Sequence, residues 1–329
     1  MDKKTIKHSL NYCKICQDQF PSERSLHAHL KKHKTSLAEY YTTHYPRKNL
    51  LTGTLLPFRD KELYFERDFE NRDQLLRWCE IESPEKVKAQ IKKMLAHRIE
   101  SKELKYAPSH LELETSEMPT IDLYKKHFGS YSKACDEIGA NPMFRRSLPK
   151  KFHEDFSEVE IFIDTREQQP LSFKSERSLK LDFGDYTASG ENYTKTFVDR
   201  KSESDFKSTL VGDNLERFRR ELQRCKDMQC YLFVVVESTL DRINNNNDFT
   251  PHKANLKFIY HNMRLLQHEF AEYCQFLFSG NRKNSEFLIP KLLTLGTPLW
   301  DVDVQYFLDK DYLWLGSKEI KNETAPSTR

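Results

Sequence analysis

Two carboxylates and a lysine near the middle of the chain have the spacing of a metal-dependent nuclease site. Asp185 follows Gly184 in a short turn, and Asp199 and Lys201 lie two residues apart on an aromatic and β-branched stretch. Side chains two apart on a strand face the same side, so we expect Asp199 and Lys201 to share one site. The carboxylates and the backbone carbonyl of Arg200 are hard oxygen ligands that suit Mg²⁺ or Mn²⁺, and the lysine could position or deprotonate the attacking water. The pattern predicts hydrolysis of a nucleic-acid phosphodiester.

The segments around these residues predict the fold that would position them. A strand ends in Asp164, an amphipathic helix covers residues 215–222, and a buried strand covers residues 231–237. An order of strand, turn, strand, helix and strand is typical of an α/β domain. Arg217 and Arg220 share one face of the amphipathic helix and are candidates for DNA contacts, with a solvated helix face as the alternative.

These motifs resemble the nuclease domain of the XPF family of structure-specific endonucleases. The family has a V/I-D-x-R-E strand end, a G-D pair and an E-R-K-x-x-x-D run. The chain shows the corresponding runs Ile163-Asp164-Thr165-Arg166-Glu167, Gly184-Asp185, Asp199-Arg200-Lys201 and Asp205. Asp199 departs from the family's glutamate, which shortens the side chain by one methylene but keeps the carboxylate.

The resemblance implies a restriction-endonuclease-like PD-(D/E)xK core over residues 155–315. The implied catalytic residues are Asp164, Glu167, Asp185, Asp199, Arg200, Lys201 and Asp205. We expect Asp185 and Asp199 to hold the metal, Asp164 to bind a second ion or its water shell, and Asp205 to anchor the site. A catalytically inactive DNA-binding relative is the alternative.

A second metal motif lies near the N-terminus, in a ββα zinc finger expected over residues 1–45. Two thiols and two imidazoles have the spacing of a closed, structural Zn²⁺ site. The four ligands are Cys13, Cys16, His29 and His33. Phe20 and Leu26 occupy the two apolar core positions of the finger. So short a unit buries too little apolar surface to fold alone, so the metal supplies the missing free energy.

The finger is predicted to contact DNA, and a protein-binding finger is the alternative. Residues 1–50 hold ten Lys or Arg against four Asp or Glu, a local charge of +6 in a chain of +3. The helix positions that would face bases carry small side chains, so the basic residues are better suited to phosphates. Those candidates are Arg24, Lys31 and Lys32.

The region over residues 60–148 is predicted to be mostly helical and to bind DNA. Ser83 followed by Pro84 is typical of a helix start. Residues 118–139 resemble a short repeat associated with homing endonucleases, with two helices around a Phe-Gly-Ser turn. The resemblance implies helix-turn-helix-like docking on DNA, with a small helical spacer as the alternative. The candidate contacts are Lys125, Lys126 and Lys133.

Length and composition agree with this multidomain α/β organisation. A chain of 329 residues supports two or three domains, and it has neither a long apolar run nor a signal peptide, so we expect no membrane partner. Of seven cysteines only two belong to the finger, which indicates a reducing, cytoplasmic compartment. Three further expectations are a loop at residues 244–247, a closing strand at 300–307 and a disordered tail at 320–329.

Together these features predict a metal-dependent DNA endonuclease with catalytic Mg²⁺ or Mn²⁺, structural Zn²⁺ and no other small-molecule cofactor. We expect a free-standing homing-type enzyme of a phage or mobile element in a bacterial cytoplasm. The alternatives are a structure-specific repair nuclease acting on branched DNA and an inactive DNA-binding protein. XPF relatives usually carry a C-terminal helix-hairpin-helix pair, and residues 296–329 show none, which favours the homing type. Whether one chain or a homodimer acts is left open.

Overall fold

The computed structural model of the chain describes residues 11–249 and 253–311 and divides into two compact units. Unit 1 comprises Met1–Lys102 and Glu117–Phe128, and unit 2 comprises Glu103–Ser116 and Gly129–Arg329. The tail expected at residues 320–329 lies outside the described residues. Within the described ranges, no helix combines the length and apolar character needed to cross a membrane.

Unit 1 is built from helices, five of which begin at a capping side chain. Its helical elements are α2 (Glu23–Leu30), the 3-10 turn η1 (Lys31–His33), α3 (Leu37–His44), α4 (Lys61–Glu66), α5 (Arg72–Ile81), α6 (Pro84–Ser101) and α8 (Ile121–Phe128). Ser83 accepts a hydrogen bond from Lys86 N and Pro84 opens α6, which confirms the predicted helix start. Helices α6 and α8 pack together, and Lys88 Nζ lies 4.7 Å from the centre of the Phe128 ring.

The ligand-bearing residues 13–33 of the finger share their core with residues that follow them. Leu26 and Leu30 of α2 are buried in one cluster with Tyr40 and Tyr41 of α3 and Tyr64 of α4. A separate zinc finger would have only its own few apolar side chains, so these aromatic rings add the buried surface that so short a segment lacks. The two expected strands of the finger are reduced, among the described residues, to one antiparallel bridge.

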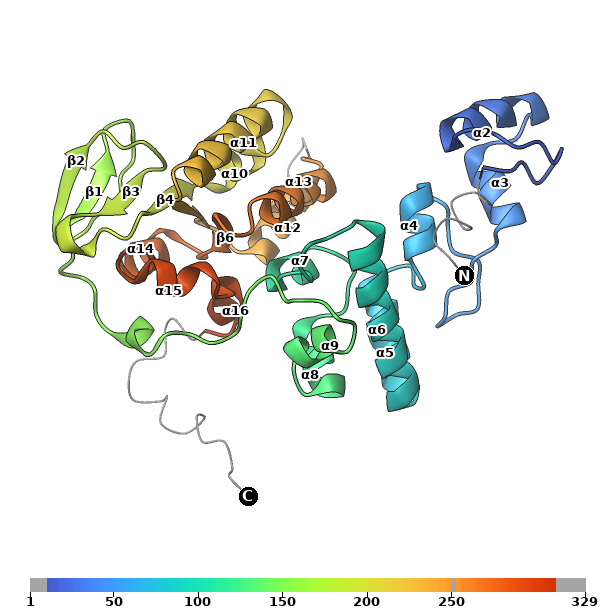
Figure 1. Cartoon of the computed structure of the whole chain (residues 1–329), viewed down its shortest axis with the longest axis horizontal. Helices are drawn as coiled ribbons and strands as arrows, with labels where there is room; N and C mark the ends of the chain where they lie inside the picture. Colours follow the sequence, from blue (N-terminus) through green and yellow to red (C-terminus); the bar gives the residue numbers. More distant parts are fainter. Residues whose placement is uncertain (1–10, 250–252, 312–329) are drawn as a thin grey trace, which may run out of the picture. The chain divides into compact units, whose positions relative to one another are not determined.

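Unit 2 contains a six-stranded mixed sheet (Figure 1). The strands are β1 (Ile161–Asp164), β2 (Glu176–Leu179), β3 (Tyr186–Ala188), β4 (Thr196–Lys201), β5 (Tyr231–Val236) and β6 (Cys274–Phe278). Their order across the sheet is β2-β1-β3-β4-β5-β6. Strand β3 is antiparallel to both β1 and β4, whereas β4, β5 and β6 run parallel. This sheet confirms the expected mixed α/β class.

Helices cover both faces of the sheet (Figure 1). Those in unit 2 are α7 (His110–Glu114), α9 (Tyr131–Asp136), α10 (Glu203–Thr209), α11 (Gly212–Asp227), α12 (Leu240–Phe249), α13 (Leu256–Glu269), α14 (Arg282–Leu295), α15 (Thr297–Trp300) and α16 (Val304–Asp309), with the 3-10 turns η2 (Lys150–His153) and η3 (Gly190–Asn192). Strand β5 is buried along its whole length. Its Tyr231, Phe233 and Val235 join the core beneath α14 and α16, and the alternate residues join the core beneath α11 and α13.

Two local expectations are wrong. Residues 244–247 belong to α12 and not to a loop. The Asn247 side-chain amide donates a hydrogen bond to Ala254 O and accepts one from Ala254 N. Residues 300–307 form no strand, because Val304, Phe307 and Leu308 recur at helical spacing and bury one face of α16. The Gln305 side chain accepts the Phe278 N–H of β6 instead.

Candidate active site and finger metal site

The alternation of β4 places Asp199 and Lys201 on one face of the sheet. Phe197 and Val198 belong to the cores on opposite faces, and Phe197 lies on the side of α10 and α11. Residues two and four positions after Phe197 share its side, so Asp199 and Lys201 face α11. The Lys201 Nζ lies 2.8 Å from Asp199 Oδ2. The strand geometry therefore brings these two side chains into contact, as expected.

The turn between Gly184 and Asp185 brings the second carboxylate to β4. Asp185 N donates to Val198 O at 2.7 Å, and Asp185 Oδ2 accepts the Arg200 N–H at 2.8 Å. Gly184 has φ of +55°, and a Cβ atom there would lie 2.6 Å from Val198 O. Only glycine fits a backbone that is both left-handed and this close to a neighbouring strand. Gly184 therefore sets the position of Asp185.

A polar cleft of about 650 Å³ surrounds these residues. Its lining comes from the β1 end, the β4 end, α10 and α11. The lining residues are Arg166, Glu167, Gln168, Gln169, Asp185, Asp199, Arg200, Lys201, Ser202, Ser204, Asp205, Ser208, Thr209, Asn214, Arg217, Phe218 and Glu221. The cleft collects six of the seven candidate catalytic residues, and Asp164 does not line it.

Burial and like charge shape the ionisation of the cleft. Burial, followed by the charge of Asp199, raises the pKa of Asp185 to about 8. Burial disfavours the Lys201 ammonium, but the negative charge of Asp199 and Asp185 outweighs it and raises the pKa of Lys201 above its usual value. Asp185 thus retains a proton near neutral pH, and Lys201 is an ammonium.

Asp164 is held at the end of β1 by hydrogen bonds to both of its carboxylate oxygens. Arg166 donates from N and Nε to Oδ1 and from a terminal nitrogen to Oδ2, and Leu181 N donates to Oδ2 at 2.7 Å. Burial acts to raise the pKa of Asp164, but these donors hold it at about 2. This geometry favours positioning of Arg166, which lines the cleft, over the ion binding expected from the resemblance.

Arg200 lies between two carboxylates. As the alternation of β4 requires, its side chain is directed away from Asp199 and Lys201. Its guanidinium donates to Glu167 and to Glu237, at 3.0 Å each, and all three side chains are largely buried. Glu167 thus serves in this structure as an acceptor for Arg200.

The remaining candidates lie on α10 and α11. Asp205 forms the first turn of α10, where its N–H donates to Ser202 Oγ and its Oδ2 accepts from the same hydroxyl at 2.7 Å. Arg217 lines the cleft, whereas Arg220 is exposed and does not line it. Of the two arginines that were expected to share a helix face, only Arg217 therefore lies at the site.

Glu221 is a cleft residue that the sequence reasoning missed. It lies one turn after Arg217 on α11, and its Oε1 accepts the Gly184 N–H at 3.4 Å. Burial and the charge of Asp199 raise its pKa. The available signal was its spacing: positions 217, 218 and 221 share one helix face. The charged segment gave no reason to choose this glutamate over its neighbour Glu216.

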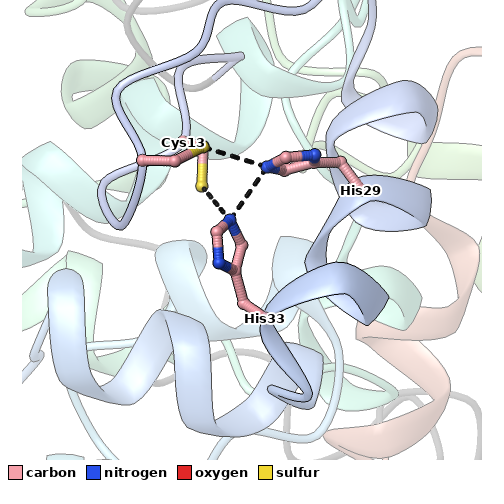
Figure 2. A group of neighbouring side chains, drawn as sticks. Cys13, His29 and His33 are labelled. Atoms are coloured by element: carbon pink, nitrogen blue, oxygen red, sulfur yellow. Dashed lines mark hydrogen bonds between the residues drawn. The ribbon is translucent and has the colours of Figure 1, made fainter.

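The four candidate zinc ligands converge in unit 1, and Figure 2 shows Cys13, His29 and His33 of this set pointing toward one another. Their donor atoms all lie within 4.8 Å of one another, and the ligand set is Cys13, Cys16, His29 and His33. The contacts Cys16 Sγ to His29 Nε2 and Cys13 Sγ to His33 Nε2 measure 3.1 and 3.6 Å. Tetrahedral Zn²⁺ with ordinary bond lengths separates its donors by roughly 3.3–3.8 Å. The donor set therefore fits one structural metal ion.

No protein-family model and no curated protein matches the chain. Two solved structures of XPF from Aeropyrum pernix, one of them in complex with DNA, are similar to it, with 20% sequence identity and a TM-score of 0.32. The similarity covers 43% of this chain for the complex and 42% for the other structure. The chain spans 66% of the length of these XPF structures.

The candidate DNA-contacting lysines and arginines outside the cleft are all exposed. In unit 1 they are Arg24, Lys31, Lys32, Lys125 and Lys126. Lys133 lies on α9 of unit 2. The expected pair of helices around a Phe-Gly-Ser turn is present as α8 and α9, and Gly129 between them has φ of +82°. The DNA contacts themselves stay a prediction.

Proposed function

We propose that this chain is a metal-dependent DNA endonuclease whose active site is the polar cleft of unit 2. One observation carries the proposal. The Lys201 ammonium contacts Asp199 at 2.8 Å in the cleft that also contains Asp185, beneath a rim that includes Arg217. Carboxylates and a lysine beside a cationic rim suit hydrolysis of a phosphodiester, because attack on phosphorus needs both a positioned water and compensation of negative charge.

The donor set fits a divalent cation. Asp185 has a pKa of about 8, so it binds a proton near neutral pH that a cation would replace. Asp185 and Asp199 would hold Mg²⁺ or Mn²⁺ together with the Arg200 carbonyl. That carbonyl points to the same edge of β4 as the Val198 carbonyl, which accepts the Asp185 N–H. When bound, the cation polarises the phosphoryl group and increases the acidity of a coordinated water.

The side chains of the cleft perform the remaining tasks. In the metal-free cleft the pKa of Lys201 is raised, so its side chain is an ammonium that can orient water and donate to a phosphoryl oxygen. In the reaction a water oxygen bonds to phosphorus while one ester P–O bond breaks, and negative charge grows on the phosphoryl oxygens. The attacking water loses a proton to solvent, and the departing ester oxygen takes one up from solvent. Arg166 and Arg217 line the cleft and can contact those oxygens, and Asp164 holds Arg166 in place.

Target selection is assigned to the finger and the α8–α9 segment. A finger loaded with Zn²⁺ would present Arg24, Lys31 and Lys32 to phosphates. Lys125 and Lys126 of α8 and Lys133 of α9 would add contacts of the same kind. Such an arrangement suits a homing-type enzyme that cuts a chosen duplex site.

The test compares the full chain with its Lys201→Ala variant on linear, supercoiled and branched DNA. Mg²⁺ or Mn²⁺ is added or omitted without a chelator, so that zinc stays in the finger. We expect Lys201→Ala to slow cleavage by at least ~10²-fold, as for other groups that stabilise the transition state. The matched control is Lys226→Ala, an exposed position of α11 outside the cleft, which should cut like the unchanged chain.

The substrate decides between the two nuclease types. Cleavage at discrete sites of linear duplex supports the homing type, and cleavage confined to branched DNA supports a structure-specific nuclease. If the unchanged chain binds DNA and cuts none of the substrates with either metal, the proposed function is wrong and the chain is a DNA-binding protein.

A further inference from the structure

Helix α11 contributes a basic, an aromatic and an acidic side chain to the lining of the cleft. Glu221 lies four residues after Arg217 and three after Phe218, and all three line the cleft. Leu222 and Cys225, on the adjoining face of α11, are buried in the core. The helix is therefore fixed against the sheet, and Glu221 reaches the cleft from a rigid element.

Glu221 faces the two predicted metal ligands. Its Oε1 accepts the N–H of Gly184, the residue before Asp185, at 3.4 Å, and its charge interacts with those of Asp199 and Lys201. The hydrogen bond to Gly184 is long and weak by the usual geometric criteria. A backbone contact of this quality does not explain why a carboxylate should be largely withdrawn from water.

The side chains around Asp185, Asp199 and Glu221 include more carboxyl groups than ammonium groups. Asp185, Asp199 and Glu221 contribute three carboxyl groups to the cleft lining, and the Lys201 ammonium in the same lining contacts Asp199 at 2.8 Å. Among the arginines of the cleft lining, Arg166 pairs with Asp164 and Arg200 pairs with two other glutamates, while Arg217 lies one turn from Glu221 and the charge of Arg224 also acts on Glu221. Three carboxylates and one ammonium would be neutralised by one divalent cation.

We infer that Glu221 is a third carboxylate ligand of the catalytic cation, contributed by α11 opposite the Gly184–Asp185 turn. This inference rests on the proposed function and adds a residue to its metal site. A ligand on the same helix as Arg217 would also link cation binding to the cationic rim of the cleft. The competing role is purely structural, in which Glu221 only accepts the Gly184 N–H.

The test uses the zinc-loaded full chain and Mn²⁺ alone as the probe. Mn²⁺ binding is measured by titration calorimetry and by the electron paramagnetic resonance signal of the free ion, and thermal unfolding is followed with and without Mn²⁺. The variant is Glu221→Gln, which keeps the shape and the hydrogen-bond acceptor but removes the charge. Glu216→Gln is the matched control, because Glu216 lies on α11, is exposed and is absent from the cleft lining.

For a ligand, Glu221→Gln should weaken Mn²⁺ binding at least tenfold, while Glu216→Gln leaves it unchanged. In metal-free buffer Glu221→Gln should unfold at the same temperature as the unchanged chain or higher, because a carboxylate that repels two others has been removed. Its stabilisation by Mn²⁺ should be smaller than that of the unchanged chain. Glu221→Asp, which retains the charge, should recover part of the affinity.

Two results would overturn the inference. One is Mn²⁺ binding by Glu221→Gln within twofold of the unchanged chain. The other is a lower unfolding temperature of Glu221→Gln in metal-free buffer together with an unaltered Mn²⁺ affinity, which is the signature of a structural role. Failure of the proposed function is separate, because then the unchanged chain itself would bind no Mn²⁺ in the cleft and cut no DNA.

Discussion

The finger of unit 1 and the cleft of unit 2 both gather metal-binding side chains, but they do so by different means. The finger ligands lie within one short stretch, from Cys13 to His33, and one turn and one helix bring them together. The cleft residues extend from Arg166 to Glu221 and meet only where β1, β4 and α11 are assembled by the sheet.

The difference affects what each site needs in order to exist. A local site forms when its metal binds, since the ion itself pays the ordering entropy of a short chain. A site assembled by a sheet is present once the two cores of unit 2 are packed, whether or not an ion is bound. The finger should therefore depend on its metal for folding, and the cleft on its metal only for chemistry.

The largest expected effect separates the two units by removing zinc. A strong chelator at neutral pH should unfold the finger, because structural Zn²⁺ contributes on the order of 10 kcal/mol to such a fold. Every cleft residue and both of its cores belong to unit 2, so that unit should keep its thermal transition. Circular dichroism with calorimetry checks this, and restoring Zn²⁺ should reverse it. Simultaneous loss of both transitions would contradict the comparison.

A smaller effect should break the cleft and spare the finger. Gly184→Ala places a Cβ atom 2.6 Å from Val198 O in a left-handed backbone, and should cost at least ~2 kcal/mol of unfolding free energy in unit 2. Gly190→Ala is the control, because φ there is +52° but nothing lies within 4 Å of the added carbon. Denaturant titration should show a clearly larger loss for Gly184→Ala. Equal losses would mean that the contact with β4 is unimportant.

A still smaller effect concerns the rim of the cleft. Arg217→Ala should weaken binding of a DNA duplex by about 1–2 kcal/mol, as expected for a lost phosphate contact. The slope of the logarithm of the binding constant against the logarithm of the salt concentration should become shallower by about one. Arg220→Ala, an exposed neighbour outside the cleft lining, should have little effect. Titrations at several salt concentrations check this. A larger effect of Arg220→Ala would move the DNA path away from the cleft.

The smallest expected effect is that the stability of unit 2 and the zinc affinity of the finger change with pH in opposite directions. Burial opposes the His110 charge, but Asp309 at 2.8 Å and Asp303 raise its pKa above 6.5. A raised pKa stabilises unit 2 at pH below 6.5, and this stabilisation is lost as pH rises through the folded-state value. Zinc binding by the finger changes in the opposite direction, because His29 and His33 must lose protons to bind.

Chemical denaturation of unit 2 at several pH values tests this difference. The unfolding free energy should fall as the pH rises above 6.5 and through the folded-state pKa, since His110 then loses its charge. His110→Gln should flatten the profile, and the zinc affinity of the finger should still increase over the same range. An unchanged slope in His110→Gln would assign the pH dependence to other groups.

The sequence alone was sufficient wherever the relevant geometry is local. The four finger ligands, the helix start at Ser83 and the contact between Asp199 and Lys201 depend on short spacings along one turn, helix or strand. The family-like run of motifs also led to six residues that line the cleft.

Only the tertiary structure decided which groups face one another across elements. It engaged Asp164 with Arg166, directed Arg200 to Glu167 and Glu237, and brought Glu221 of α11 to the Gly184 turn. Those contacts depend on sheet order and on the placement of helices, and neither has a periodicity that can be read along the chain. The same reason explains residues 300–307. Their apolar pattern is compatible with a strand, but in the structure Gln305 lies on α16 and accepts the Phe278 N–H of β6.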